Sequence, residues 1–260
     1  MRPAKSGSLS YKKEITVPPK NVFQRIELKY LLSPEDKKAV LDAMAEYMRI
    51  DSYGRTTIRN IYYDDPSFRL IRRSIEKPKY KEKLRVRSYR RAEPDSEVFV
   101  ELKKKYKGVV FKRRVSLPES VAADWLCGGV IPNDGQIFRE IEYFRDFYGS
   151  LRPSLFLSYE REAYYLISGG DLRITFDENI YARTTDLSLC SEAYGDPVLP
   201  EGRTLMEIKS SGAMPLWLTK VLSERGIYKT SFSKYGVAYT KYILPCMAKE
   251  KQKEYVYEIL

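Results

Sequence analysis

Histidine is absent from the 260 residues of this chain, and cysteine occurs only three times. Without histidine, Ser-His-Asp triads, histidine general bases and histidine metal ligands are excluded. A bound metal would have to use oxygen ligands, which favours Mg²⁺, Mn²⁺ or Ca²⁺. The widely spaced Cys127, Cys190 and Cys246 form no Cys-x-x-Cys pair, so we expect neither a disulfide framework nor a cysteine-rich zinc site. This cysteine usage predicts a reducing, cytoplasmic location.

Long hydrophobic runs are missing as well. No apolar run approaches the roughly 18–20 residues needed to span a bilayer, so we expect no transmembrane segment. The first 20 residues lack the apolar region of a signal peptide. We expect a flexible lead-in over residues 1–20, one domain over residues 21–245 and a C-terminal tail over residues 246–260. The tail is either a peripheral helix or a segment that binds a partner.

Charge is strongly biased toward the positive. The chain has 46 Lys and Arg against 35 Asp and Glu, a formal net charge of +11. A basic excess of this size predicts an anionic partner, which could be nucleic acid, a phosphorylated small molecule, polyphosphate or an anionic membrane.

Eight segments alternate like β-strands, which predicts an α+β protein with an antiparallel sheet. Eight antiparallel strands can close into a barrel whose interior holds side chains and one small ligand. We therefore expect a closed eight-stranded β-barrel with helices packed on its outside. The expected helices cover residues 34–49, 118–127, 135–148, 215–225 and 233–243. The expected strands are Phe23–Leu31, Thr56–Tyr63, Tyr80–Tyr89, Glu97–Lys105, Val109–Leu117, Ser154–Tyr165, Asp171–Asn179 and Arg203–Lys209.

The segment Lys79–Arg87 has cations at every second position. Successive side chains on a strand point to opposite faces, so these five cations share one face while Tyr80, Glu82, Leu84 and Val86 share the other. A solvated sheet face is the simpler explanation for a single strand. Six strands separate charged from apolar side chains in this way, however, and neighbouring like charges cost stability unless an anion binds.

Four carboxylates lie in phase with these cations: Glu27, Glu101, Asp177 and Glu207. They would repel a nucleic-acid backbone, and the charged face has few of the aromatic side chains that stack on bases. We therefore expect no nucleic-acid partner. Cations for phosphate oxygens and carboxylates for a metal are the mixture that a metal–phosphate site needs. The pattern predicts an enclosed site for a polyphosphate-type ligand and a divalent metal.

These residues resemble a known family, the triphosphate tunnel metalloenzymes (the CYTH-like superfamily). Within it, the chain looks most like the catalytic domain of the vacuolar transporter chaperone (VTC) complex, from about Phe23 to Tyr242. The motifs that carry the resemblance are Arg25-Ile-Glu-Leu-Lys29, the alternating Lys81, Lys83, Arg85 and Arg87, Glu101-Leu-Lys103, Tyr159-x-Arg161, Arg173-x-Thr-x-Asp177, Glu207-x-Lys209 and Ser231-Phe-Ser233-Lys234.

The resemblance implies a polyphosphate polymerase, which transfers the terminal phosphoryl group of ATP to a polyphosphate chain with Mn²⁺ or Mg²⁺. Its implied metal ligands are Glu207 and Glu27. The implied catalytic residues are Arg85, Arg87, Lys103, Arg161 and Lys209. Further phosphate-binding residues implied are Arg25, Lys29, Lys83, Lys112, Arg114, Tyr159, Arg173, Ser233 and Lys234.

One position departs from the family pattern. Tunnel hydrolases begin with Glu-x-Glu-x-Lys, and here Arg25 stands at the first glutamate. The loss of one carboxylate favours polymerisation over hydrolysis. A triphosphatase, or a non-catalytic module that binds polyphosphate or RNA, remains an alternative, and a separate membrane-protein partner is possible. At single residues, Glu207 alternatively forms a structural salt bridge to an arginine, and Glu27 alternatively orients Lys29 or Arg25.

Overall fold

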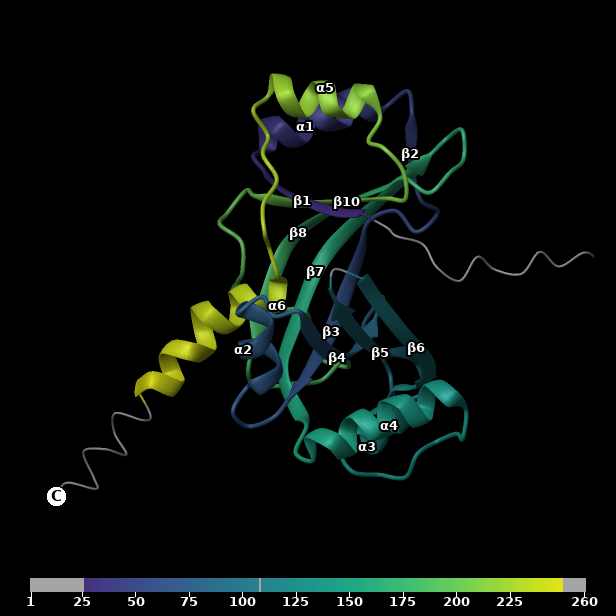
Figure 1. Ribbon diagram of the computed structural model, residues 1–260, viewed down its shortest axis with the longest axis vertical. Helices are drawn as coiled ribbons and strands as arrows, with labels where there is room; N and C mark the ends of the chain where they lie inside the picture. The colour runs from purple at the N-terminus through teal and green to yellow at the C-terminus, as the bar shows by residue number, and fades with distance from the viewer. Residues whose placement is uncertain (1–25, 108, 250–260) are drawn as a thin grey trace, which may run out of the picture.

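The computed structural model describes residues 26–107 and 109–249 (Figure 1). Within them lies one antiparallel sheet of ten strands in the order β1-β10-β8-β7-β3-β4-β5-β6, with β2 paired to β7 and β9 to β8. The antiparallel α+β class is thus as predicted. The strands are β1 (Ile26–Leu32), β2 (Met48–Ile50), β3 (Thr56–Asp64), β4 (Tyr80–Ser88), β5 (Glu97–Tyr106), β6 (Val109–Pro118), β7 (Arg152–Leu166), β8 (Arg173–Arg183), β9 (Asp196–Pro197) and β10 (Thr204–Ser210).

The expected closed barrel of eight strands is wrong, because the two edge strands of this sheet, β1 and β6, do not pair. The free edge of β1 is already occupied. Tyr30 forms an antiparallel bridge with Lys229, and the amide of Thr230 donates to the carbonyl of Lys29 at 2.7 Å. This later segment occupies part of the edge of β1, and among the described strands β6 pairs only with β5.

Most helices cover the apolar side of the sheet, as expected. The pair α1 (Pro34–Met44) and α5 (Leu216–Glu224) lies together over β1 and β10, and α3 (Glu119–Leu126) and α4 (Gln136–Tyr148) lie beside β5 and β6 (Figure 1). The alternation predicted from sequence is what buries this face: Leu84, Val86 and Val100 are in the core under α3 and α4. We call the opposite, charged face of the sheet the inner face.

The C-terminal helices differ from the expectation. Residues 233–243 form α6 (Lys234–Ala238) and a π-helix, η1 (Tyr239–Ile243), and these pack on the inner face. The ring of Tyr235 stacks on Tyr62, with centroids 4.6 Å apart. Helix α6 thereby covers the apolar part of the inner face and brings Lys234 to its charged part.

Two further elements depart from the prediction. The helix expected over residues 34–49 ends at Met44, because the chain turns to pair β2 with β7. A short helix, α2 (Arg69–Ile75), was not predicted. The chain is also helical over residues 244–249, the start of the expected tail. The expected lead-in, residues 1–20, and Arg25 lie outside the described residues. No helix in the described ranges is long and apolar enough to cross a membrane.

Candidate functional site

The first half of the site is built around Glu101, whose carboxylate is 1% exposed at the centre of β5. It pairs across the sheet with Arg85 on one side and Arg114 on the other. Its Oε2 accepts from Arg85 Nε at 2.8 Å, and its Oε1 accepts from Arg114 Nε at 2.8 Å and lies 2.6 Å from Lys112 Nζ. Arg87 Nε is 4.0 Å away. One carboxylate thus orients four cations.

Uncharged side chains from β3 and β7 fix the two arginines of β4. Arg87 donates to Asn60 Oδ1 at 2.9 Å and to the hydroxyl of Tyr159 at 3.1 Å, and Arg85 donates to the hydroxyl of Tyr62 at 3.2 Å. The sequence did not predict Asn60 and Tyr62 as site residues, because they are neutral and the site was recognised by its pattern of charged residues. The sequence indicates only that they stand two positions apart on one strand and so share a face of the sheet.

The second half of the site is built around Asp177 and Glu207, which are both buried. Arg161 donates two hydrogen bonds to Asp177, from Nε at 2.5 Å and from Nη2 at 2.6 Å, and the same Nη2 lies 3.5 Å from Glu207 Oε2. Lys234 Nζ, brought by α6, is 2.5 Å from Asp177 Oδ2 and 3.1 Å from Glu207 Oε1. Lys209 Nζ is 3.7 Å from Glu207 Oε2. The cations therefore converge on one buried pair of acids.

One ion pair joins the two ends of the open sheet. Glu27 on β1 lies 3.5 Å from Lys29 Nζ and 3.7 Å from Lys103 Nζ, which belongs to β5. Lys29 is in turn 3.3 Å from Glu207 Oε1. The sheet is therefore curved enough for charged side chains to span the gap that backbone hydrogen bonds leave open.

Positive charge dominates the site strongly enough to keep its acids ionised. Burial raises the pKa of Glu101, but attraction by Arg85, Arg87 and Lys112 outweighs it and leaves this pKa well below its usual range. Burial likewise opposes ionisation of Glu207, yet its neighbouring ammonium and guanidinium groups hold its pKa far below 4.5. Both acids remain charged at neutral pH.

Two lysines of the site have a pKa below the usual lysine value. Burial, against partial compensation by Glu207, lowers the pKa of Lys209 to about 8. Burial also lowers the pKa of Lys83 to about 8, and repulsion by Lys81, Lys103 and Lys29 contributes. The Lys83 ammonium donates to a hydroxyl, Ser233 Oγ, at 3.0 Å. An anion in the site would stabilise the charged form of both lysines.

The two glutamates assigned to a metal face the same ammonium group, that of Lys29. In the part of the chain that the structure describes, no group of three or more Asp, Glu or Cys side chains could hold a metal ion. Mg²⁺ in phosphate sites takes one or two carboxylates and completes its coordination with phosphate oxygens and water. Glu27 and Glu207 therefore fit a metal that binds together with a phosphate ligand, and not an all-protein cage.

The structure brings nearly all the sequence-predicted residues to one inner face, with two exceptions. Arg173 lies at the rim, half exposed, and its nearest acid is Asp51 at 3.4 Å. Arg25 is outside the described residues. Ser233 reaches the site through Lys83 but also accepts from the amide of Gly236 at 3.2 Å, as the N-cap of α6. Its role is thus partly structural.

A curved antiparallel sheet with a cation-lined inner face defines a protein of the triphosphate tunnel class, here with an open seam. The model of the VTC domain family matches residues 24–243, so the chain belongs to that family. A comparison with curated proteins finds no match.

Several solved structures are similar to this chain. HpAC1 from Hippeastrum, an adenylyl cyclase candidate described as having a dominant triphosphatase activity, is 19% identical with a TM-score of 0.53, and the match covers 85% of this chain and 98% of that one. An adenylate cyclase candidate from Vibrio parahaemolyticus is 11% identical over 83% of this chain and 97% of that one, with a TM-score of 0.45. The PH1819 protein from Pyrococcus horikoshii OT3 is 17% identical, and the match covers 84% of this chain and 99% of that one, with a TM-score of 0.42. The fold assignment rests on the family match and on HpAC1.

Proposed function

We propose that this protein is a polyphosphate polymerase that transfers the terminal phosphoryl group of ATP to an inorganic polyphosphate chain. The observation that carries the proposal is the imbalance of charge on the inner face. Among the described residues, ten cations gather there around four carboxylates, which are Glu27, Glu101, Asp177 and Glu207. The cations are Lys29, Lys83, Arg85, Arg87, Lys103, Lys112, Arg114, Arg161, Lys209 and Lys234. A chain of phosphates supplies the missing negative charge along the whole face.

The chemistry needs positioning more than a protein nucleophile. A terminal oxygen of the polyphosphate attacks the γ-phosphorus of ATP, the bond from that phosphorus to the β-phosphate oxygen breaks, and ADP leaves. Arg85, Arg87 and Arg161 are held by fixed partners, so they stabilise the transferring group without reorganising. A Mn²⁺ or Mg²⁺ ion bound at Glu207 and Glu27 would neutralise phosphate charge. The lack of histidine is no obstacle to this reaction.

Triphosphate hydrolysis is the second candidate, because the neighbour HpAC1 is described as having a dominant triphosphatase activity. The two reactions share a donor site and differ in the acceptor, which is a phosphate chain in one and water in the other. Binding of polyphosphate or RNA without catalysis is the third. A cytoplasmic location stays a prediction and agrees with the three unpaired cysteines.

One assay separates these functions. The purified protein is incubated with ATP and Mn²⁺, and with tripolyphosphate and Mn²⁺, and the products are analysed by gel and by phosphate release. We expect ADP and long-chain polyphosphate from ATP. Phosphate release from tripolyphosphate with no polymer would support the triphosphatase instead. Salt-sensitive binding with neither product would support the non-catalytic module.

The double variant Arg85→Ala/Arg87→Ala tests whether the inner face carries the activity. Glu101 keeps Lys112 and Arg114 as partners in this variant, so the fold should persist, while activity should fall at least 100-fold. Arg113→Ala is the matched control, because Arg113 lies on the opposite face of β6 and pairs with Glu140 at 2.7 Å. A double variant that unfolds, as seen by circular dichroism, would make these arginines structural.

A further inference from the structure

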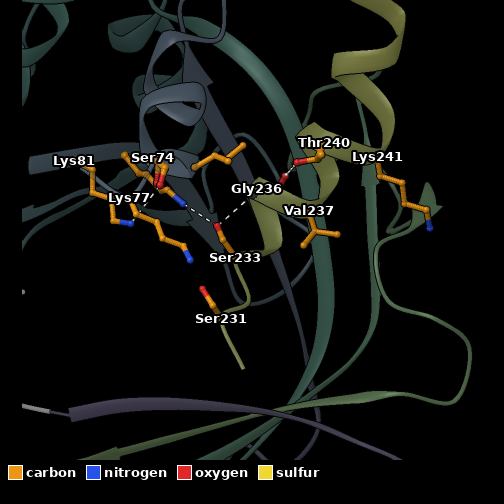
Figure 2. A pocket seen from close by; sticks show the side chains of 11 residues that line it. Ser74, Lys77, Lys81, Ser231, Ser233, Gly236, Val237, Thr240 and Lys241 are labelled. Atoms are coloured by element: carbon orange, nitrogen blue, oxygen red, sulfur yellow. Dashed lines mark hydrogen bonds between the residues drawn. The ribbon is translucent and has the colours of Figure 1, made fainter. Parts of the chain in front are cut away.

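A cavity of about 510 Å³ lies beside the site, between α2, β4 and α6. Figure 2 shows Lys77 and Lys81 on one side of it and Ser231 and Ser233 on the other, with their side chains directed toward a common space. Lys83 of β4 also lines it. Lys77, Lys81 and Ser231 lie outside the clusters around Glu101 and Glu207. Lys83 and Ser233 lie between the pocket and these clusters.

The lining contains lysines and hydroxyls but no carboxylate. Among the described residues, Lys77, Lys81 and Lys83 form no ion pair, whereas the cations around Glu101 do. The polar contacts of the pocket lysines are with neutral groups: Lys81 donates to the carbonyl of Ser74 at 3.4 Å, and Lys83 donates to Ser233. The pocket therefore offers positive charge that no protein acid neutralises.

Lys77 stands at the end of α2 in a backbone conformation that favours glycine. It follows the C-cap of α2 with a φ of 55°, the left-handed region that favours glycine. A lysine there is strained relative to glycine, and such strain persists where the surroundings or the function require it. Its ammonium group has no hydrogen-bond or ion-pair partner within the described chain, so a structural contact of the side chain does not explain it.

Residues 231–233 lie between the pocket and the main site. The carbonyl of Phe232 accepts from Lys29 Nζ at 2.9 Å, so this segment touches the Glu207 cluster on one side. On its other side, Ser233 Oγ accepts from Lys83 and Ser231 lines the pocket. Repulsion from Lys103 and Lys29 reaches Lys83, which puts the pocket in the same positive field. Lys83 thus lies between the two regions of positive charge.

We propose that this pocket is a distal phosphate subsite, in which Lys77, Lys81 and Ser231 bind the remote phosphates of an inorganic polyphosphate chain whose near end lies at Glu101 and Glu207. The proposal rests on the proposed function for its ligand. It makes the pocket a determinant of chain length, because only a longer chain supplies phosphates beyond those bound at Glu101 and Glu207. Lys241, at the far rim in Figure 2, takes no part because its ammonium donates to the carbonyl of Pro197 at 2.9 Å.

The test compares binding of two probes, sodium tripolyphosphate and long-chain sodium polyphosphate, by isothermal titration calorimetry. The variant is Lys77→Gly/Lys81→Ala, in which glycine suits the left-handed backbone and so preserves the fold. We expect its affinity for the long chain to fall about tenfold, as for the loss of two ammonium–phosphate contacts, and its affinity for tripolyphosphate to change less than about twofold. The charge-matched control is Lys38→Ala/Lys220→Ala, two exposed lysines on α1 and α5.

The other possible results of this titration would contradict either the subsite alone or the proposed function as well. Equal losses for both probes, no loss for either, or a loss confined to tripolyphosphate would contradict the subsite. A wild-type protein that binds neither anion would overturn the proposed function and the subsite together. A wild-type protein that binds both anions, beside an unaffected variant, would overturn the subsite alone.

Discussion

At the scale of single residues, Lys83 and Lys209 make phosphate binding sensitive to pH. Both have a pKa of about 8, lowered from 10.5 mainly by burial. As the pH rises through 8 they lose the charge that binds phosphate, so we predict that affinity for tripolyphosphate falls about tenfold between pH 7 and pH 9. Calorimetry at constant ionic strength measures this fall.

A guanidinium that does not titrate provides the control. In Lys83→Arg/Lys209→Arg the affinity should change less than about threefold over the same range, and an equally steep fall in this variant would contradict the assignment. Unfolding does not explain the loss. Because the pKa of both lysines is lower in the folded than in the unfolded state, the unfolded chain binds more protons between pH 8 and 10.5. The contribution of these lysines to stability therefore rises with pH in that window.

At the scale of elements, one buried acid joins β3 to the two helices that frame the distal pocket. The carboxylate of Asp64 is fully buried and accepts from the amides of Leu70 and Ile71, at 2.8 and 3.0 Å, and from the hydroxyl of Tyr235 at 2.9 Å. Asp64→Asn turns one acceptor into a donor that faces other donors. We predict a loss of about 2–4 kcal/mol in the free energy of unfolding, measured with urea.

Tyr235→Phe is the complementary change, because it removes only one of these hydrogen bonds. Its expected cost is about 1–1.5 kcal/mol. The two residues are in contact, so the double variant should cost less than the two single costs added together. Strict additivity in a double-mutant cycle would show that Asp64 does not couple α2 to α6.

The start of α2 could not be predicted from the sequence, because its first amides are capped by residues that precede the N-cap position. Helix α2 has only seven residues, and its N-cap is Phe68 in a left-handed conformation. Its first amide, that of Arg69, donates to Asp65 at 3.0 Å, and the next two donate to Asp64 at the end of the preceding strand. No Ser, Thr, Asp or Asn stands at the N-cap position itself. By contrast, the start of α1 was predictable, because Ser33 accepts from the amide of Asp36 at 3.1 Å and Pro34 follows it directly. A cap at the N-cap position can be read from sequence, whereas the caps of α2, Asp64 and Asp65, stand several residues before that position.

At the scale of the whole molecule, the two-residue period predicted the inner face and most of its residues. That period is a local property of each strand, and the pairing of Arg85 with Glu101 and of Lys29 with Glu207 follows from it once the strands are adjacent. Closure of the sheet was not predictable, since it depends on which segment takes the free edge of β1. That segment, Lys229–Thr230, is about 200 residues away in the chain and has no strand pattern of its own.

The open seam leads to a prediction for the whole protein. The edge strand β1 and strand β5 meet there through the pair Glu27–Lys103 at 3.7 Å, with further cations on both sides. A phosphate chain that binds both sides should link them, so tripolyphosphate at about 100 times its Kd should add about 2.7 kcal/mol of stability and raise Tm by roughly 5–10 °C. Scanning calorimetry measures the shift, with sodium chloride at equal ionic strength as the control. Hydrogen exchange should show added protection in β1 and in β5 and β6 together. Protection on only one side of the seam would mean that the anion occupies one half of the sheet and does not bridge it.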